Sequence, residues 1–407
     1  MKKTVLLRGS FVLVFSLFIS LLPASSFGEI LTVKHTVKQT FGGGQSPDDA
    51  RIFAIAKAKR EALEKAGTYI ESLTVVKNTK LEKDEILALT AGVLKAEVVS
   101  QKSYASDDVV VMEIIVNVIV DTSVLEEKVK KQLQDRTHLT ELKEIQKREK
   151  ELLQKVAQLE EENRKLSANN QSTEKIKKGF QQASEGLTAV DCLYKAYALW
   201  DGQKVTDPQK AIEYLNNAIK LQPDYARAYS SRGLSYYYLG QYQQAIKDCN
   251  EAIRLKPDLS NAYNNRGMVY GKLGQYQLSI EDFNKAIRLK PDDAVPYYNR
   301  GLSYYYIGKY QLAIEDYNEA IHLKLSYANA YFGRGTSYLN LEQHQRAIED
   351  FNEVIRLKPD YAAAYNNRGT AYITQGNSTQ GCLDAQKACA LGDCKLLEHV
   401  KGKDLCH

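Results

Sequence analysis

A 34-residue period constrains this chain more than any other feature. The six residues AYNNRG occupy positions 262–267 and recur unchanged at 364–369, three periods further along. Aligning the chain in steps of 34 from residue 226 gives four complete units up to residue 361 and a fifth that decays after residue 369. Such a period is typical of an array of small units, each of which packs on its neighbours. The sequence therefore predicts an elongated stack for this part of the chain.

Each unit has the pattern of two amphipathic helices. Apolar and small residues recur at steps of three and four on both sides of a short break such as LGQY at 239–242, which indicates two helices joined by a tight turn. A glycine in each unit marks a close crossing of the two helices, and a proline ends the second helix in most units. These columns are Gly233, Gly267, Gly301, Gly335 and Gly369, and Pro257, Pro291 and Pro359, with Leu325 as the exception.

These columns resemble the tetratricopeptide repeat family, whose 34-residue helix–turn–helix has fixed glycine, tyrosine, alanine and proline positions. The resemblance is complete over 226–361, four full repeats. It extends to a degenerate first repeat at 185–225, which keeps the second-helix pattern AIEYLNNAIKLQP, and to a partial repeat with a cysteine-rich cap at 362–407. It implies an all-α solenoid, a right-handed superhelix whose first helices line a groove for a protein or peptide partner.

Every unit from residue 226 onward has an arginine followed, at one fixed spacing, by an aspartate, whereas the degenerate first unit has neither. A partly buried guanidinium needs a carboxylate partner, so we expect structural ion pairs that link the two helices of each unit. The alternative is that the arginines hold an anionic ligand. The pairs are Arg232 and Asp248, Arg266 and Asp282, Arg300 and Asp316, Arg334 and Asp350, and Arg368 and Asp384.

The peptide-binding candidates lie on the first helices. In family members with an asparagine ladder on the inner surface, these amides hold the backbone of an extended peptide, because an amide both donates and accepts hydrogen bonds. The matching column here is interrupted by Gly333 and begins with a serine. The alternative is that these asparagines are solvated and that the tyrosines only pack between helices. The candidates are Ser231, Asn265, Asn299, Asn367, Tyr237, Tyr238, Tyr305 and Tyr306.

Residues 29–125 have a different pattern. The segment ILTVKHTVKQTF (30–41) alternates like a half-buried strand, and Ser46, Pro47 and Asp49 are typical of a capped helix start. A short helix at 83–94 precedes a hairpin of 96–105 with 109–120. We expect a small α+β domain of ordinary size.

Residues 126–178 are rich in Glu, Lys and Gln and have an apolar stripe at steps of three and four. Such a stripe predicts a coiled coil and hence a homo-oligomer, with Glu149 and Asn163 at inward positions. The alternative is one long amphipathic helix that packs on its own chain. The stripe consists of Leu142, Ile145, Leu152, Val156, Leu159 and Leu166.

Residues 1–28 have the pattern of a signal peptide: a basic start, an apolar run at 11–22 that is too short to span a bilayer, and small residues before a cleavage site. We expect an exported protein, periplasmic or secreted, without a membrane span. In that setting the cysteine cluster near the end of the chain predicts disulfides between a helix and the following tail. The disulfide candidates are Cys382, Cys389, Cys394 and Cys406, while Cys192 and Cys249 are equally compatible with unpaired buried thiols.

The composition gives no sign of nucleic-acid binding. The formal charge is +5, and removal of Lys2, Lys3 and Arg8 with the signal peptide leaves +2, without a basic cluster. The six histidines are scattered, and we predict no catalytic residue, metal or cofactor. The favoured function is a non-enzymatic protein–protein interaction scaffold of the bacterial cell envelope. The alternative is an envelope-assembly or cell-wall-associated factor that acts mainly through its N-terminal domain.

Overall fold

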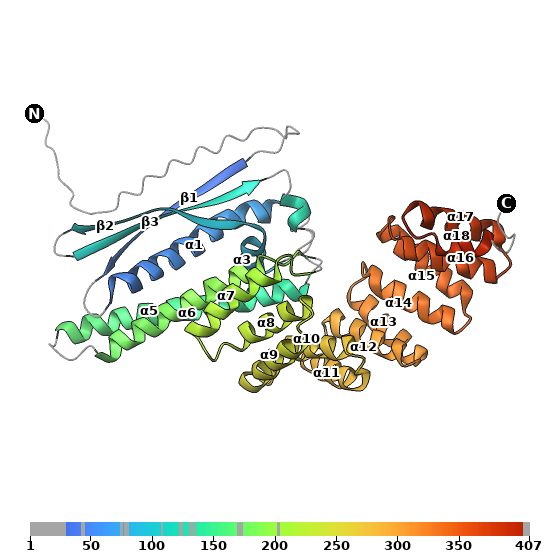
Figure 1. Ribbon diagram of the computed structural model, residues 1–407. Helices are drawn as coiled ribbons and strands as arrows, with labels where there is room; N and C mark the ends of the chain where they lie inside the picture. Colours follow the sequence, from blue (N-terminus) through green and yellow to red (C-terminus); the bar gives the residue numbers. More distant parts are fainter. Residues whose placement is uncertain are drawn as a thin grey trace, which may run out of the picture.

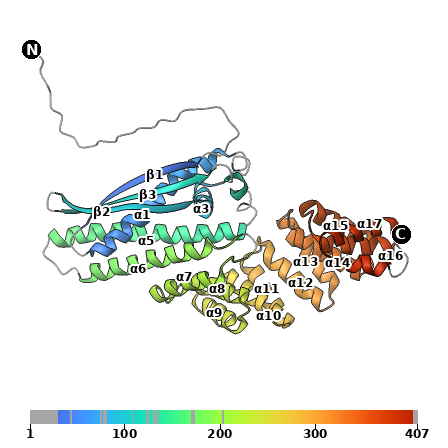
Figure 2. The ribbon, with the colours of Figure 1, turned by 45° about the horizontal axis from the view of Figure 1, so that its top comes forward.

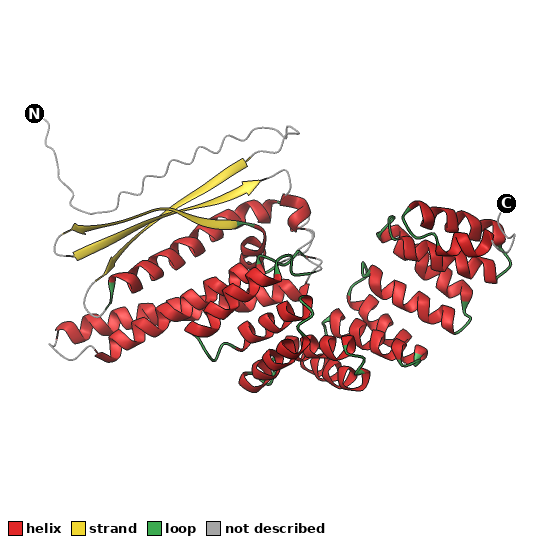
Figure 3. Cartoon of the chain, viewed as in Figure 1, coloured by secondary structure: helices red, strands yellow, loops and turns green. Residues whose placement is uncertain are grey.

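The structure is a computed structural model. It describes residues 30–401 except for 42–44, 74–75, 77–80, 107–108, 122–124, 130–132, 134–135, 169–173 and 202–203. The expected signal peptide and Cys406 lie outside the described residues. Three strands form a sheet near the start of the described chain, and helices make up the rest of it (Figure 3).

The sheet has the strand order β1-β3-β2, and both strand pairs are antiparallel. Its strands are β1 (Ile30–Phe41), β2 (Lys95–Ser106) and β3 (Val109–Asp121). The helix α1 (Pro47–Ser72) covers one face, and the shorter α3 (Lys83–Val93) follows it. Ser46 and Asp49 form a capping box at the start of α1. The expected α+β region is thus confirmed.

Alanine at every fourth residue explains how α1 approaches the sheet so closely. Ala54, Ala58, Ala62 and Ala66 are fully buried in one core with the β3 residues Ile114, Val116 and Val118. A stripe of small side chains lets the helix backbone lie near the sheet, and alternation along β3 turns one side of the strand inward. The face of the sheet opposite α1 carries no described helix (Figures 1 and 2).

Most of the apolar stripe predicted to form an intermolecular coiled coil packs within the chain instead, while the side chain of Leu166 lies outside what the structure describes. It lies on α5 (Arg136–Ala168), which forms a hairpin with α6 (Glu174–Tyr197) alongside α1. Leu142 is buried in the core of the sheet region, whereas Ile145, Leu152 and Val156 are buried against Phe180, Leu187 and Val190 of α6. A Cβ on Gly179 or Gly186 would lie 2.9 or 3.1 Å from Leu159 or Leu152. The alternative interpretation, a helix packed on its own chain, therefore replaces the coiled coil.

The remaining helices form a stack that extends away from the sheet region (Figure 1). α6 packs on α7 and so opens the stack. The helices are α7 (Pro208–Leu221), α8 (Ala226–Tyr238), α9 (Tyr242–Leu255), α10 (Ser260–Lys272), α11 (Tyr276–Leu289), α12 (Ala294–Tyr306), α13 (Tyr310–Leu323), α14 (Ala328–Asn340), α15 (His344–Leu357), α16 (Ala362–Thr374), α17 (Ser378–Ala390) and α18 (Lys395–Lys401). The predicted solenoid of paired helices is confirmed.

Each unit from residue 226 onward has a glycine where its two helices cross, and all but one of these units have a second glycine at the turn between the helices. A Cβ on Gly301 would lie 2.9 Å from the ring of Tyr317 and 3.2 Å from the carbonyl oxygen of Ala313, so the two helices of the unit cross without room for a side chain. At the turn between the helices, Gly308 has φ +75°, and Glu342 occupies the equivalent turn of the next unit with φ 59°. That region of φ is strained for a residue with a Cβ.

Candidate functional site: a groove between the repeats and α5

A cavity of about 560 Å³ lies on the inner side of the stack, and we call it the inner groove. It is bounded by the start of α5, the end of α6, and the first helices of successive units. Its polar and aromatic lining residues include His138, Glu141, Tyr197, Trp200, Arg227, Ser230, Ser231, Tyr238, Asn261, Asn264, Asn265, Asp293, Asn299, Lys324, Tyr327, Asn329 and Lys358. Apolar side chains such as Leu215, Leu234 and Met268 also line it. The groove therefore offers a ligand apolar surface together with hydroxyl and amide groups that can form hydrogen bonds.

The chain places its own carboxylate at one end of the inner groove. Glu141 of α5 forms an ion pair with Arg227 of α8, and its Oε1 accepts a hydrogen bond from Asn261 Nδ2 at 2.6 Å. The hydroxyl of Tyr197 donates to Glu141 Oε2 at 3.0 Å, and burial raises the pKa of that tyrosine. Burial alone would lower the pKa of Arg227, but Glu141 raises it overall. These contacts fix α5 to the repeats.

The middle of the inner groove holds three of the predicted peptide-binding residues. Asn265 donates from Nδ2 to the backbone oxygen and to Oγ of Ser230, both at 3.2 Å, and Asn299 donates from Nδ2 to Asn264 Oδ1 at 3.1 Å. Ser231 Oγ donates to the Tyr197 hydroxyl at 3.4 Å. The amides therefore link successive first helices as well as lining the groove.

The other candidates divide between the groove and the turns. Tyr238 lines the groove, with its ring 6.4 Å from that of Trp200. Tyr237 and Tyr305 pack at the turns of their own units, against Tyr242 and Tyr310 at 6.2 and 5.5 Å. Tyr306 stacks on Tyr276 at 5.3 Å and is 59% exposed. Asn367 is half-buried on α16, outside the groove lining.

Two lysines from successive units line the far end of the inner groove. Lys324 follows α13 with its Nζ 5.2 Å from the centre of the Tyr327 ring, and Lys358 follows α15 and donates to Asn329 Oδ1 at 3.3 Å. Among the described residues, neither lysine has a carboxylate oxygen within 4.0 Å. The groove therefore has an ion pair at one end and, within the described chain, two cations without an anionic partner at the other.

The arginines predicted to form structural pairs hold the units together. Each guanidinium donates from Nε and Nη2 to both oxygens of its aspartate at 2.5–2.9 Å. Its Nη1 donates to an asparagine of the preceding unit at 2.5–2.7 Å. These asparagines are Asn216, Asn250, Asn284, Asn318 and Asn352. Three nitrogens of each guanidinium donate hydrogen bonds within the repeats, and the arginines lie outside the groove lining. This geometry is that of a structural contact between helices and not of a ligand site. Gln386 lies one repeat period after Asn352, at the position that these asparagines occupy in the preceding units.

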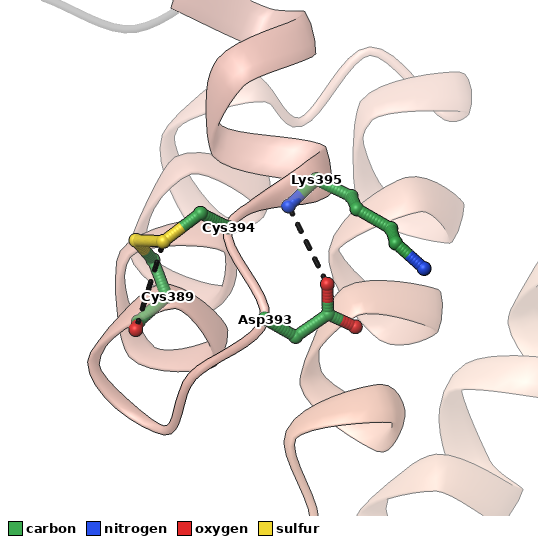
Figure 4. Close-up of a disulfide and its surroundings, with 4 residues drawn as sticks. All are labelled: Cys389, Asp393, Cys394 and Lys395. Atoms are coloured by element: carbon green, nitrogen blue, oxygen red, sulfur yellow. Dashed lines mark hydrogen bonds between the residues drawn. A yellow bond between two sulfur atoms is a disulfide. The ribbon is translucent and has the colours of Figure 1, made fainter.

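A disulfide joins Cys389 at the end of α17 to Cys394 just before α18, with a Cα–Cα distance of 4.0 Å (Figure 4). It ties the helix to the following tail, the arrangement expected from the sequence. Cys382 also takes part in a disulfide. Cys192 and Cys249 are free and buried, and burial raises the pKa of both thiols.

Sequence reasoning missed the contribution of α5 and the end of α6 to the inner groove. The sequence pattern places Glu141 and His138 in a coiled-coil segment, and no local pattern connects them with the repeats, because Glu141 and Arg227 are far apart in the chain. Lys324 and Lys358 stand out in the sequence only as part of the motif that ends each second helix, and nothing in that motif indicates that they line a groove.

In the described part of the chain, no cluster of three or more His, Cys, Asp or Glu side chains is arranged to hold a metal ion. No helix there is both long and apolar enough to cross a bilayer.

Comparisons with known proteins agree with the repeat geometry. Two models of the tetratricopeptide repeat match, one at residues 226–259 and 260–293 and the other at 298–362 and 332–390. A search of curated proteins finds no significant match.

Several solved structures are similar to part of the chain. YrrB, described as a TPR protein with an unusual peptide-binding site, is 23% identical, with 47% of this chain and 99% of that chain covered and a TM-score of 0.41. A MamA crystal structure is 27% identical, with 42% and 96% covered and a TM-score of 0.37. MamA from Desulfovibrio magneticus RS-1 is 21% identical, with 41% and 94% covered and a TM-score of 0.39.

Proposed function

We propose that the chain is a non-enzymatic scaffold that binds an extended peptide segment of a protein partner in the inner groove. Its residues 226–293 and 298–390 match models of the tetratricopeptide repeat. The observation that carries this proposal is the row of amide and hydroxyl side chains that successive first helices present to one cavity. Ser230, Asn264, Asn265 and Asn299 come from three consecutive units and meet in it.

The chemistry of these side chains suits a peptide backbone. An extended peptide presents one N–H and one C=O per residue, and each must find a partner when it leaves water. A carboxamide can serve either group, since its oxygen accepts and its nitrogen donates two protons. Asn299 uses one N–H on Asn264, so its second N–H and its oxygen remain for a ligand.

The proposal does not include oligomerisation through α5, because Leu142, Ile145, Leu152 and Val156 of that helix are buried against α6 and the sheet region. We further propose that the protein works in an oxidising compartment such as the periplasm. The disulfide between Cys389 and Cys394 supports this location, since such bonds persist mainly outside the reducing cytosol.

The test uses the full chain and a displayed library of random peptides. Selected peptides are synthesised, and their affinities are measured by calorimetry against wild type, Asn299→Ala and Asn217→Ala. Asn299 lines the groove, whereas Asn217 is an exposed asparagine on α7 and serves as the matched control. We expect Asn299→Ala to weaken binding about tenfold, the equivalent of one lost hydrogen bond, and Asn217→Ala to leave it unchanged.

Two results would contradict peptide binding in the inner groove. Selected peptides that bind Asn299→Ala as tightly as wild type would show that the groove is not their site. Photo-crosslinks from these peptides to the β1–β3 sheet would instead favour a role of the N-terminal region. Circular dichroism of each variant checks that the repeats are folded.

A further inference from the structure

We infer that the inner groove selects acidic segments, whose Asp or Glu side chains pair with Lys324 and Lys358. This inference names the class of partner and rests on the proposed peptide-binding function. It starts from the charge distribution in the groove, where these two lysines have no carboxylate within 4.0 Å among the described residues. A cation that lines a cavity without an anionic partner is most readily satisfied by an anionic ligand.

Each of the two lysines contacts a neighbouring side chain of the repeats. Both follow the last residue of a second helix, and they are one repeat period apart, so they occupy the same position in successive units. Lys358 donates to Asn329, and Lys324 lies over the ring of Tyr327. Two cations held on successive units match a ligand with more than one carboxylate, whereas a single terminal carboxylate offers only one.

The same cavity already binds a carboxylate at its other end. Arg227, Asn261 and Tyr197 hold Glu141 with a guanidinium, an amide and a hydroxyl. Asn261 and Asn329 are two periods apart and belong to the same column of the repeat. The end with Lys324 and Lys358 thus combines a cation and an asparagine amide, as the Glu141 site does, with lysine in place of arginine. Within the described part of the chain, no carboxylate pairs with these two lysines.

The one remaining acidic group of the groove lining fits this assignment. Asp293 lies at the start of α12, between the two ends, and its Oδ1 accepts a hydrogen bond from the backbone N–H of Val295. Its charge disfavours a ligand carboxylate in the middle of the groove. Acidic side chains of a bound segment are therefore directed toward the two lysines.

The repeat supplies matched controls for a test. Lys256 and Lys290 occupy the same position after α9 and α11, but they are not part of the groove lining. Charge reversal at any of these positions has the same unfavourable effect on a helix C-terminus. A difference between Lys324→Glu and Lys290→Glu therefore reports on the groove and not on general stability.

The probe is a fluorescein-labelled peptide of about 12 residues, which spans roughly 40 Å when extended, with alternating Glu and Ala and an amidated C-terminus. Matched peptides have Lys and Ala, or Ser and Ala with a free C-terminal carboxylate. Anisotropy with the full-length protein should give binding of the Glu peptide only, weakened at high salt because the interaction is ionic. We expect Lys324→Glu and Lys358→Glu each to weaken it about tenfold, and Lys290→Glu less than about twofold.

Three results would overturn the inference. Equal weakening by Lys290→Glu would mean non-specific charge attraction. Equal or tighter binding of the Ser peptide would mean recognition of a free C-terminus or of backbone alone. Display-selected peptides that need Asn299 but show no enrichment in Asp and Glu would leave the peptide-binding function intact and contradict only the acidic preference.

Discussion

The guanidinium of Arg300 joins two successive repeat units through Asn284. Its Nη1 lies 2.5 Å from Asn284 Oδ1 in the preceding unit, while Nε and Nη2 bind Asp316 in its own unit at 2.8 and 2.5 Å. A solenoid is usually held together by apolar contact between neighbouring hairpins. Here a charge-assisted hydrogen bond at each junction adds a directional contact that fixes how one unit sits on the next.

Replacement of Arg300 by leucine should destabilise the repeats without removing ligand binding. The change leaves Asp316 buried without its partner, and breaking a buried pair in this way costs about 3 kcal/mol. Urea unfolding followed by circular dichroism measures the loss, and calorimetry with a selected peptide measures binding, which should persist because Arg300 lies outside the groove lining.

The double variant Arg300→Leu with Asp316→Leu is the control. It removes both charges, so it should be clearly more stable than Arg300→Leu alone. Lost peptide affinity in a folded Arg300→Leu protein would instead mean that the arginine contacts the ligand.

Leu152→Ala should lower stability and leave the association state unchanged. The side chain is 6% exposed and packs on α6 in the same chain, so its truncation creates an internal cavity that costs about 2–4 kcal/mol. Thermal unfolding measures the first effect and sedimentation velocity the second. A variant that keeps its unfolding midpoint but dissociates from an oligomer would restore the coiled-coil interpretation.

Glu149 should make stability depend on pH. Burial raises its pKa to about 7, against the opposing effect of Arg60 and Lys59. Because the pKa is higher in the folded state than the ordinary 4.5, folding favours the protonated form. The free energy of unfolding should therefore fall as pH rises from about 4.5 to about 7, by roughly 3 kcal/mol from this group.

Glu149→Gln tests this directly, because an amide does not titrate. Thermal midpoints between pH 5 and 8 should vary less in this variant than in wild type, and the variant should be the more stable protein above pH 7. Glu151→Gln, on an exposed side of α5, is the control. Parallel pH profiles for wild type and Glu149→Gln would show that this carboxyl is not responsible.

Glu342→Gly should stabilise the repeats. Glu342 adopts φ 59° at a turn where other units have glycine at φ 73–84°. A side chain in this conformation costs about 1–2 kcal/mol, which glycine partly relieves after its own entropic cost. We expect a gain of about 1 kcal/mol in urea unfolding. The reciprocal change Gly308→Glu should cost a similar amount, and a destabilised Glu342→Gly protein would be the contrary result.

The regular parts of the fold were predictable because they follow local rules. The repeat period identified the paired helices, and the Ser46–Asp49 capping box marked the start of α1. The co-occurring columns also predicted the Arg–Asp contacts, since both residues lie in one hairpin. The asparagine that completes each contact belongs to the preceding unit, so no analysis of a single unit could find it.

The inner groove was only partly predictable for the same reason. The asparagine column located Asn265 and Asn299, but Glu141 reaches the groove from a helix that lies far ahead of Arg227 in the chain. The apolar stripe on α5 shows that this face of the helix is covered. The pattern does not say whether α6 of the same chain or a second copy of the protein covers it, and the prediction of an intermolecular surface was therefore wrong.

The Arg–Asn junctions also determine where the array could be lengthened. A copy of a whole unit placed between two existing ones would bring its own arginine, aspartate and asparagine, and it would satisfy both of its new neighbours. A copy placed after α17 would meet Gln386, whose longer side chain stands where the incoming guanidinium needs the oxygen of an asparagine. Engineered extension should therefore succeed internally and require Gln386→Asn at that far junction.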